Sequence, residues 1–362
     1  MEVLLIFISI YFITKFKDVP FVFYVLIFRT FFMILVHIFY QFTYSASEGL
    51  DPVYNDEFFF MRIARSTYDY NFDISHLFLP EHGSSIYYGF FLGLFNDFCF
   101  SLELSTRLFN NLTFISIMLI VRKYCKLINI SKKFTKYTQY FILLSPSLMF
   151  FSTKILRDIQ ICLLVTLCFY FLESRKYLLS FLWMIFLGLL RKHLVASLAF
   201  SFIYKIIPFN FRYTFTFSFL IFCLLFLANV PYLDSFKFDI FMYPLIYIMH
   251  LLGLNFLIAD ASMFIVSFER VIIQRIFAFD TVIPQILLLY YIFKGYKNKN
   301  LLITTKLYFI LNIPYLYLYH QEGYTAARQT VIPFIPIILL QIAYYASCNH
   351  RKYFRLLKLK ST

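Results

Sequence analysis

The chain has 362 residues, of which 61% are hydrophobic and only 14% charged, and its mean hydropathy is +0.73. This composition excludes an ordinary soluble domain. The formal net charge of +14 would suggest nucleic-acid binding, but the basic residues stand between apolar segments, as they do in the cytoplasmic loops of membrane proteins. The composition therefore indicates an all-α integral membrane protein without a nucleic-acid partner.

Apolar stretches that approach the length of a membrane-spanning helix recur along the whole sequence. About 20 residues cross a bilayer as a helix, and fewer suffice where the membrane thins. In chain order the candidate spans are Val3–Thr14, Pro20–Phe42, Leu108–Val121, Tyr137–Phe151, Ile159–Leu172, Tyr177–Leu190, Leu194–Ile207, Tyr213–Val230, Thr281–Phe293, Leu301–Leu318 and Gln329–Ser347. The first is the weakest, and lying at the membrane surface is its alternative. We predict a single transmembrane domain, 1–362, with about ten or eleven crossing helices.

The basic residues gather in alternate loops between these spans. The clusters are Lys15/Lys17, Arg122/Lys123/Lys126/Lys132/Lys133/Lys136, Arg175/Lys176, Lys205/Arg212, Lys294/Lys297/Lys299 and the tail Arg351/Lys352/Arg355/Lys358/Lys360. Placing all of them in the cytoplasm satisfies the positive-inside rule and puts the C-terminus there too. Of the 19 carboxylates, only Asp18 and Glu173 fall in these cytoplasmic turns, which favours a functional surface on the outer side.

Two apolar stretches are not expected to cross the membrane. Ser84–Phe100 is long enough, but crossing would move the most basic loop to the outer side. We therefore predict an outer loop over 43–107 with a re-entrant or membrane-surface helix. Lys237–Phe268 mixes apolar runs with acidic residues and predicts a second outer loop, 231–278, with interfacial helices. Irregular backbone near a membrane is tolerated only against protein or a water-filled cavity, so both loops predict an outer cavity.

The first outer loop concentrates carboxylates directly after an early span. Asp51, Asp56 and Glu57 lie in the run DPVYNDE. A carboxylate there can act as a general base toward a sugar hydroxyl, or it can bind a metal beside a phosphate. The simpler alternative is a solvated acidic loop. Asp56 and Glu57 are the favoured candidates, because an aromatic, membrane-proximal run follows them.

A second polar group, Ser145-Pro146-Ser147 followed by Ser152, Lys154, Arg157 and Asp158, stands between two spans. The last three are spaced by about one helical turn, so we expect them to share a helix face. A guanidinium is suited to bidentate phosphate binding, and an ionised side chain near lipid needs a compensating role. The alternative is an Arg–Asp pair that only ties helix ends together.

Two further clusters lie at predicted outer ends of spans. Arg191 and His193 stand in a very short turn, where a bound pyrophosphate would balance the charge and His193 can move a proton. Snorkelling toward lipid headgroups is the alternative there. His320 and Glu322 precede Arg328, which is predicted at an outer helix N-terminus, where backbone N–H groups favour anions. For that cluster the alternative is an interfacial anchor.

Common cofactor and metal motifs are missing from the sequence. The six cysteines show neither a CxxC pair nor metal-ligand spacing, which disfavours a disulfide framework and a zinc site. There is no Walker loop, GxGxxG, GxSxG or HExxH, so nucleotide-dependent and zinc-peptidase chemistry lack their basic parts. We therefore expect no cofactor and no metal.

The order of these motifs resembles bacterial membrane enzymes that handle undecaprenyl-linked glycans. The acidic motif is followed by SPSLMFFSTKILRD, LGLLRKH and AARQTVIPFIPIILL. This layout is similar to the repeat-unit polymerases of O-antigen or capsule (Wzy-like). It is also similar to the GT-C class of transferases that use a polyprenyl-phosphate-linked sugar. The compact length and the lack of an appended domain favour the polymerase.

The resemblance implies metal-independent glycosyl transfer at the periplasmic face of the bacterial inner membrane, for lipopolysaccharide or capsule biosynthesis. The substrate would be an undecaprenyl-pyrophosphate-linked oligosaccharide. The implied phosphate ligands are four basic residues: Lys154, Arg157, Arg191 and Arg328. The base would be one of three residues: Asp56, Glu57 or His193. The implied glycan contacts are Asp51, Asp158, His320 and Glu322.

The expected partners are membrane lipids and a protein that regulates chain length. A competing hypothesis is a flippase or transporter for the same lipid-linked sugar. Transporters tend to contain internal repeats and discontinuous helices near the bilayer midplane, whereas no repeat is visible here and the outer charges cluster at span ends. A structural or sensor membrane protein is a third hypothesis.

Overall fold

The computed structural model describes residues 1–43, 55–69, 85–191, 194, 279–280, 282–291 and 332–361. Within these residues every regular element is an α-helix or a 3-10 helix, which confirms the predicted all-α class for this part of the chain. The predicted spans Leu194–Ile207, Tyr213–Val230 and Leu301–Leu318 and the second loop, 231–278, lie outside the described residues, apart from Leu194 itself.

Three of the described helices are long and apolar enough to cross a membrane. They are α2 (Pro20–Thr43), α5 (Leu102–Leu127) and the segment Ile332–Asn349, which joins η8 (Ile332–Phe334) to the first part of α18 (Ile335–Ser361). All three coincide with predicted spans. Only a third of the apolar window of α2 is buried, against about two thirds in α5, so α2 is peripheral and α5 central.

The other helices that match predicted spans are shorter. They are α1 (Glu2–Ile13), α8 (Asp158–Glu173), α9 (Tyr177–Leu190) and the helix Val282–Tyr291. An α-helix rises about 1.5 Å per residue, so the sixteen residues of α8 cover about 24 Å. That is less than the hydrocarbon core of about 30 Å.

The predicted span Tyr137–Phe151 is wrong as a single helix. The structure contains two helices instead, α6 (Lys132–Leu143) and α7 (Pro146–Thr153). Pro146 occupies the first turn of α7, where its missing N–H costs nothing, and the Ser145 hydroxyl accepts from the Leu148 N–H at 3.3 Å. The Ser-Pro pair therefore starts a new helix within a continuous apolar run.

The segment predicted as the first outer loop contains α3 (Asn55–Asp69), α4 (Ser85–Gly93) and η5 (Asn96–Phe98). With nine residues, α4 covers about 13 Å and is too short to cross, as predicted for Ser84–Phe100. It packs closely on α3 through Gly89. A Cβ atom on Gly89 would lie 2.5 Å from Cγ2 of Ile63.

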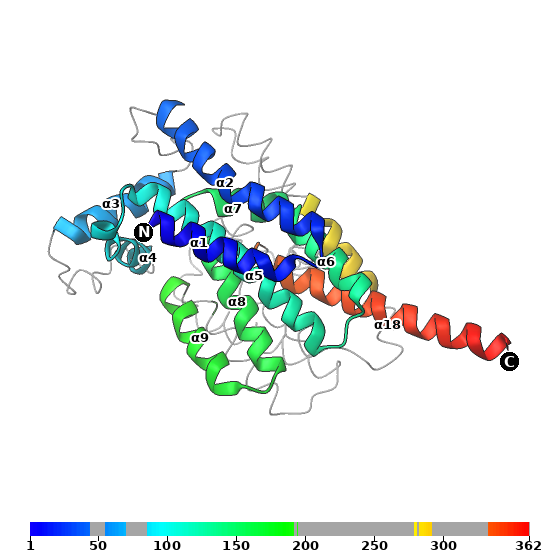
Figure 1. Ribbon diagram of the computed structural model, residues 1–362. Coiled ribbons are helices and arrows are strands. Elements are labelled where there is room, and N and C mark those ends of the chain that lie inside the picture. Colours follow the sequence, from blue (N-terminus) through cyan, green and yellow to red (C-terminus); the bar gives the residue numbers. More distant parts are fainter. Residues whose placement is uncertain are drawn as a thin grey trace, which may run out of the picture.

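α5 organises the core, because it contacts α1, α2, α6, α7, α8 and α18. In Figure 1, α3 and α4 lie at one end of the assembly, while α18 extends past the other helices at the opposite end. Most of the buried side chains of α5 are apolar, but its N-terminal half contains Arg107, Asn110 and Asn111, all fully buried. These three residues share a helix face, since they are spaced by three and four positions.

Several of the basic loops lie together at one end of the helices. Arg122, near the end of α5, donates to the Lys15 carbonyl at 2.6 Å and forms an ion pair with Asp18. The rings of Tyr124 and Tyr170 lie 5.9 Å apart, which brings the basic turn after α8 to the same end. The Ser131 N–H, just before α6, donates to the Ser347 hydroxyl of α18. The common placement agrees with the predicted grouping of these loops.

Gly89→Ala tests the close packing of α3 on α4. In an exposed helix, alanine would be more favourable than glycine by about 1 kcal/mol. Here the clash with Ile63 reverses the sign, and we expect a loss of about 1–3 kcal/mol. Thermal unfolding of the detergent-purified protein measures the change. Adding Ile63→Ala removes Cγ2 but leaves Cβ of residue 63 at 2.6 Å, so it should not restore the stability; an unchanged melting temperature in Gly89→Ala would contradict the packing.

The Asp18–Arg122 pair predicts a pH dependence. The hydrogen bond from Arg122 holds the pKa of Asp18 below its ordinary value, so the stabilisation is present at neutral pH and is lost as the pH falls through the lowered pKa. The Asp18 side chain is mostly exposed, and pairs of this kind contribute about 0.2–1 kcal/mol. Asp18→Asn should therefore melt slightly lower at pH 7 and together with wild type in acid. A gap that widens toward low pH would refute the pairing.

Candidate functional site

The described residues bring a polar cluster together around the connection between α7 and α8. This connection, 154–157, interrupts the helical hydrogen bonding: Lys154 has extended backbone (φ −91°, ψ 159°), and α8 begins only at Asp158. Peptide groups that lose their helical partners must find others when they are buried among apolar helices. The side chains that supply these partners define the site.

A buried ion pair binds both sides of the break. Glu57 of α3 and Arg107 of α5 are both fully buried, with 3.5 Å between Oε2 and Nη2. Glu57 also accepts from the Ile155 N–H at 2.8 Å, and Arg107 donates to the Thr153 carbonyl at 2.6 Å. The pair therefore joins α3 to α5 and satisfies one backbone donor and one backbone acceptor of the connection.

Asn110, one turn further along α5, satisfies two more carbonyls. Its Nδ2 donates to the carbonyl of Lys154 and, at 3.4 Å, to that of Leu156. Its Oδ1 accepts from Gln160 of α8 and lies 3.5 Å from the Tyr88 hydroxyl of α4. Four elements thus meet at one buried amide, and the conformation of the connection is fixed from several sides.

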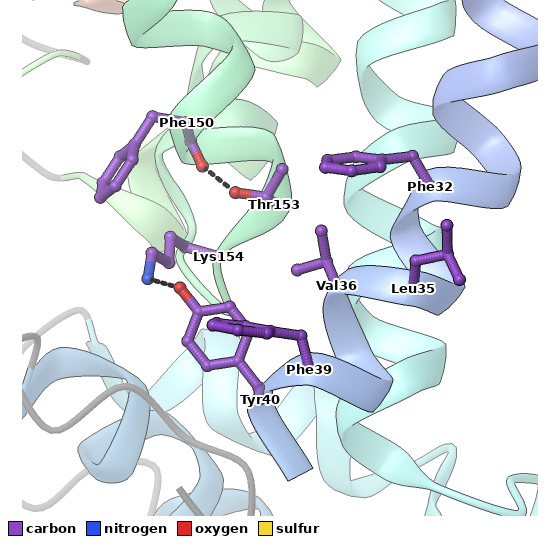
Figure 2. A pocket seen from close by; sticks show the side chains of 8 residues that line it. All are labelled: Phe32, Leu35, Val36, Phe39, Tyr40, Phe150, Thr153 and Lys154. Carbon is purple, nitrogen blue, oxygen red and sulfur yellow. Dashed lines mark hydrogen bonds between the residues drawn. The ribbon is translucent and has the colours of Figure 1, made fainter. Parts of the chain in front are cut away.

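The side chain of Lys154 turns toward α2. Its Nζ is hydrogen-bonded to the Tyr40 hydroxyl and lies 4.6 Å from the centroid of the Tyr40 ring (Figure 2). The Arg107 guanidinium also lies 4.6 Å from that centroid. Tyr40 consequently contacts two cations at once, through a hydroxyl and an electron-rich ring face, both of which favour positive charge.

The side chains of Arg157 and Asp158 bind different partners. The predicted common face of Lys154, Arg157 and Asp158 is therefore wrong. Lys154 caps the end of α7, whereas Arg157 and Asp158 begin α8. Arg157 donates to the Leu190 carbonyl at 2.9 Å, while Asp158 is fully buried and pairs with Arg191 at 2.9 Å. The break in the helix replaces neighbours on one face with partners from other helices.

The cluster places two of the predicted phosphate ligands at the same end of α9. Arg157 reaches Leu190, the last residue of that helix, and the next residue, Arg191, reaches back to Asp158. Asp158, predicted as a glycan contact, is therefore the carboxylate that neutralises Arg191. Five other predicted site residues lie outside the described part: Asp51, His193, His320, Glu322 and Arg328. The backbone of Asp56 lies in the first turn of α3, but its side chain is outside the description.

Arg29 joins the cluster from within α2, and the sequence reasoning did not single it out. Its Nε donates to Asn111 of α5 at 3.0 Å, Nη2 contacts the Ser152 hydroxyl of α7, and the guanidinium lies 3.9 Å from the centroid of the Phe114 ring. The sequence did contain a signal for Arg29, because a polar or ionised residue inside an apolar span normally faces protein. Asn110 and Asn111, inside the apolar span of α5, carry the same signal.

Asp280 was also not singled out from the sequence. It binds the start of α7, at the break between α6 and α7. Its carboxylate accepts from the backbone N–H of Ser147 at 2.9 Å, from the Ser147 hydroxyl at 2.7 Å, and from the Ser145 hydroxyl. A carboxylate at the N-terminus of α7 is favoured by the unpaired N–H groups there. No pattern in the sequence indicates that Asp280 reaches Ser145.

Positive charge exceeds negative charge in this cluster. Its described members include five cationic side chains, Arg29, Arg107, Lys154, Arg157 and Arg191, and three carboxylates, Glu57, Asp158 and Asp280. A further carboxylate on α5, Glu103, pairs with Arg65 at 2.8 Å and leaves the balance unchanged. The described part of the site therefore has a formal excess of two positive charges, and such a region favours anions. Within the same part, no group of three or more potential metal-ligating side chains is present.

No protein-family model, no curated protein and no solved structure matches the chain. The resemblance to repeat-unit polymerases therefore stays a prediction.

Glu57→Gln tests the buried pair. Glutamine retains an oxygen for the Ile155 N–H, but the positive charge of Arg107 then loses its counter-charge in the interior. Removing one partner of a buried ion pair typically costs about 3–5 kcal/mol, so the melting temperature of the purified protein should fall. The double variant Glu57→Gln with Arg107→Gln removes the buried charge and should recover part of the loss. If the two single effects simply add, the two residues are not coupled.

Proposed function

We propose that this chain is a polytopic membrane glycosyltransferase that polymerises undecaprenyl-pyrophosphate-linked oligosaccharide repeat units into O-antigen or capsular polysaccharide. The observation that supports the proposal best is the cationic excess of the cluster around 154–157. A region with an excess of positive charge attracts anions. A pyrophosphate is such an anion, and its polyprenyl chain belongs in the bilayer beside the helices.

Arg157 is the proposed contact to the pyrophosphate. It is only partly buried, whereas Arg107, Lys154 and Arg191 are buried. Its bond to the Leu190 carbonyl and the Phe60 ring, 5.7 Å from the guanidinium, orient the side chain. A guanidinium has five N–H donors in a planar fork that suits phosphate oxygens, so one bond to a carbonyl does not prevent phosphate binding. Arg191 and Arg328 are proposed to assist from the same side.

In the proposed reaction, the terminal hydroxyl of one lipid-linked unit attacks the anomeric carbon of the growing chain. A carbon–oxygen bond forms, the bond from that carbon to the pyrophosphate breaks, and undecaprenyl pyrophosphate leaves with the electron pair. The hydroxyl proton passes to a carboxylate. Each well-placed cation that neutralises the departing charge typically contributes several kcal/mol.

Asp56 is the proposed base. Glu57, the neighbouring candidate, is fully buried and is held by Arg107 and by the Ile155 N–H. Its carboxylate oxygens are engaged by these partners and enclosed by protein, so they are not placed to meet a substrate hydroxyl. We therefore assign a positioning role to Glu57, while His193 stays an alternative base.

The proposed orientation places the basic end of the helices in the cytoplasm. The loops with Lys15, Arg122 and Arg175 lie at that end, and the positive-inside rule assigns such loops to the cytoplasm. The C-terminus then faces the cytoplasm of a bacterial inner membrane, and ten or eleven spans in total are proposed, as the length rule indicates. The chain-length regulator is proposed as a protein partner.

One observation favours a transporter as the second candidate. The helices α6, α7 and α8 are separated by breaks at Ser145 and at 154–157, and discontinuous helices near charged residues are common in transporters. A flippase for the same lipid-linked sugar would use the same affinity for pyrophosphate. A GT-C-type transferase acting on a polyprenyl-phosphate sugar would also fit the cationic cluster.

Arg157→Ala tests the proposal in a bacterial strain whose own copy of the gene has been deleted. We expect polymer to be lost by at least about a hundredfold, since removing a charged donor at a transition state costs about 2.7–4 kcal/mol. Gel analysis of lipopolysaccharide or capsule, together with immunoblotting of the tagged protein, measures polymer and protein abundance. Arg157→Lys should retain part of the activity, because charge remains but the fork geometry is lost.

The matched control is Arg62→Ala, which removes an exposed arginine of α3 and should leave the polymer intact. Single repeat units on the lipid core would support a polymerase. Loss of all repeats would point to a flippase or an upstream transferase. Full-length ladders in Arg157→Ala at normal protein abundance would remove Arg157 from the mechanism.

A further inference from the structure

A groove of about 410 Å³ lies where α2 meets α7 (Figure 2). Its walls are mainly apolar: Phe32, Leu35, Val36 and Phe39 of α2, with Phe150 of α7. Lys154 and Tyr40 stand at one end of it. The groove therefore combines a hydrocarbon-like wall with a single cationic end.

The position of this groove along α2 matches the depth profile of a lipid. The 24 residues of α2 extend about 36 Å, enough to cross the hydrocarbon core of about 30 Å. Tyr40 lies three residues before the end of the helix, and Phe32 lies eight residues deeper, or about 12 Å along the axis. The polar end is consequently at headgroup level and the apolar wall lies within the hydrocarbon region.

The α2 side of the groove is apolar and exposed. α2 has large apolar side chains that are exposed along this part of the helix, including Phe28 at 66%, Phe31 at 50% and Phe39 at 60%. In a helix that crosses a membrane, such side chains contact lipid. Lipid molecules can therefore enter the groove sideways, without passing through the protein interior.

The charge at the polar end is suited to a phosphate. The Lys154 ammonium lies beside the Tyr40 hydroxyl and 5.2 Å from the centroid of the Phe150 ring, and the Arg107 guanidinium contacts the same Tyr40 ring. Because Glu57 neutralises Arg107, the ammonium of Lys154 is the cation that sets the potential at this end. A basic pocket between transmembrane helices, next to an apolar wall, is the arrangement that selects anionic lipid headgroups.

We propose that this groove binds one anionic phospholipid from the leaflet at the Tyr40 end of α2. Its phosphate accepts a hydrogen bond from the hydroxyl of the half-buried Tyr40, which itself accepts from the buried Lys154 behind it, and one acyl chain lies along Phe32, Val36 and Phe39. The bound lipid fills the space between α2 and α7, and the Lys154 ammonium attracts its phosphate through Tyr40. This site goes beyond the proposed glycan polymerisation and does not require it.

The test uses full-length protein purified in detergent and titrated with phosphatidylglycerol or, separately, with phosphatidylcholine. Native mass spectrometry counts the bound lipids. Lys154→Met removes the ammonium group but keeps a long side chain, and it should weaken phosphatidylglycerol binding about fivefold, as expected for one lysine contact at a membrane surface. Lys133→Met, which removes an exposed lysine of α6, is the matched control and should change nothing.

Two further variants separate the apolar wall from the charge. Val36→Trp fills the groove and should weaken the binding of both lipids. Tyr40→Phe removes only the hydroxyl at the polar end of the groove. If the Lys154→Met protein does not elute as a single species, Tyr40→Phe replaces it as the charge-end variant, that is, the variant that tests this polar end. Equal phosphatidylglycerol affinity in wild type and in the charge-end variant would overturn the proposal. Displacement of phosphatidylglycerol by equimolar undecaprenyl phosphate would also overturn it, because the groove would then belong to the substrate lipid.

Discussion

The buried pair of Glu57 and Arg107 is the interaction on which the centre of this protein depends. Two opposite charges removed from water are stable only when they face each other and their remaining hydrogen-bonding atoms are satisfied. Here the satisfying partners are the backbone groups of Ile155 and Thr153, which a continuous helix would have used internally. The ion pair and the helix break therefore stabilise each other: the break supplies hydrogen bonds, and the pair allows the break to be buried.

This mutual dependence explains why so many cations can gather between apolar helices. Once α7 ends at Thr153, the chain turns, and Lys154, Arg157 and Asp158 leave in different directions. Each then meets a partner from another helix, as Asp158 does with Arg191. A straight helix would have left these groups on one face, near one another and near lipid. The break thus converts a local charge cluster into a network that joins α2, α3, α5 and α9, and on this network the proposed chemistry rests.

The sequence predicted the positions of α2, α5 and the apolar part of α18 well, because the length and hydrophobicity of a span are local properties. Among the described residues, the basic loops that follow α1, α5 and α8 lie at one end, as predicted. It failed at Tyr137–Phe151, where the apolar run conceals a helix start at Ser145 and Pro146. A second break, at 154–157, makes the predicted shared face of Lys154 and Asp158 wrong. Helical periodicity applies only within one uninterrupted helix.

The sequence alone determined where apolar helices long enough to cross a membrane lie and, for the described loops, which of them group together, because the transfer free energies of apolar and basic residues between water and lipid are nearly additive along the chain. Only the tertiary structure decided which charges pair. Glu57 meets Arg107, and Asp158 meets Arg191, across helices that are distant in the sequence. The energy of such a pair depends on separation and burial, and both are set by how the helices pack rather than by residue identity.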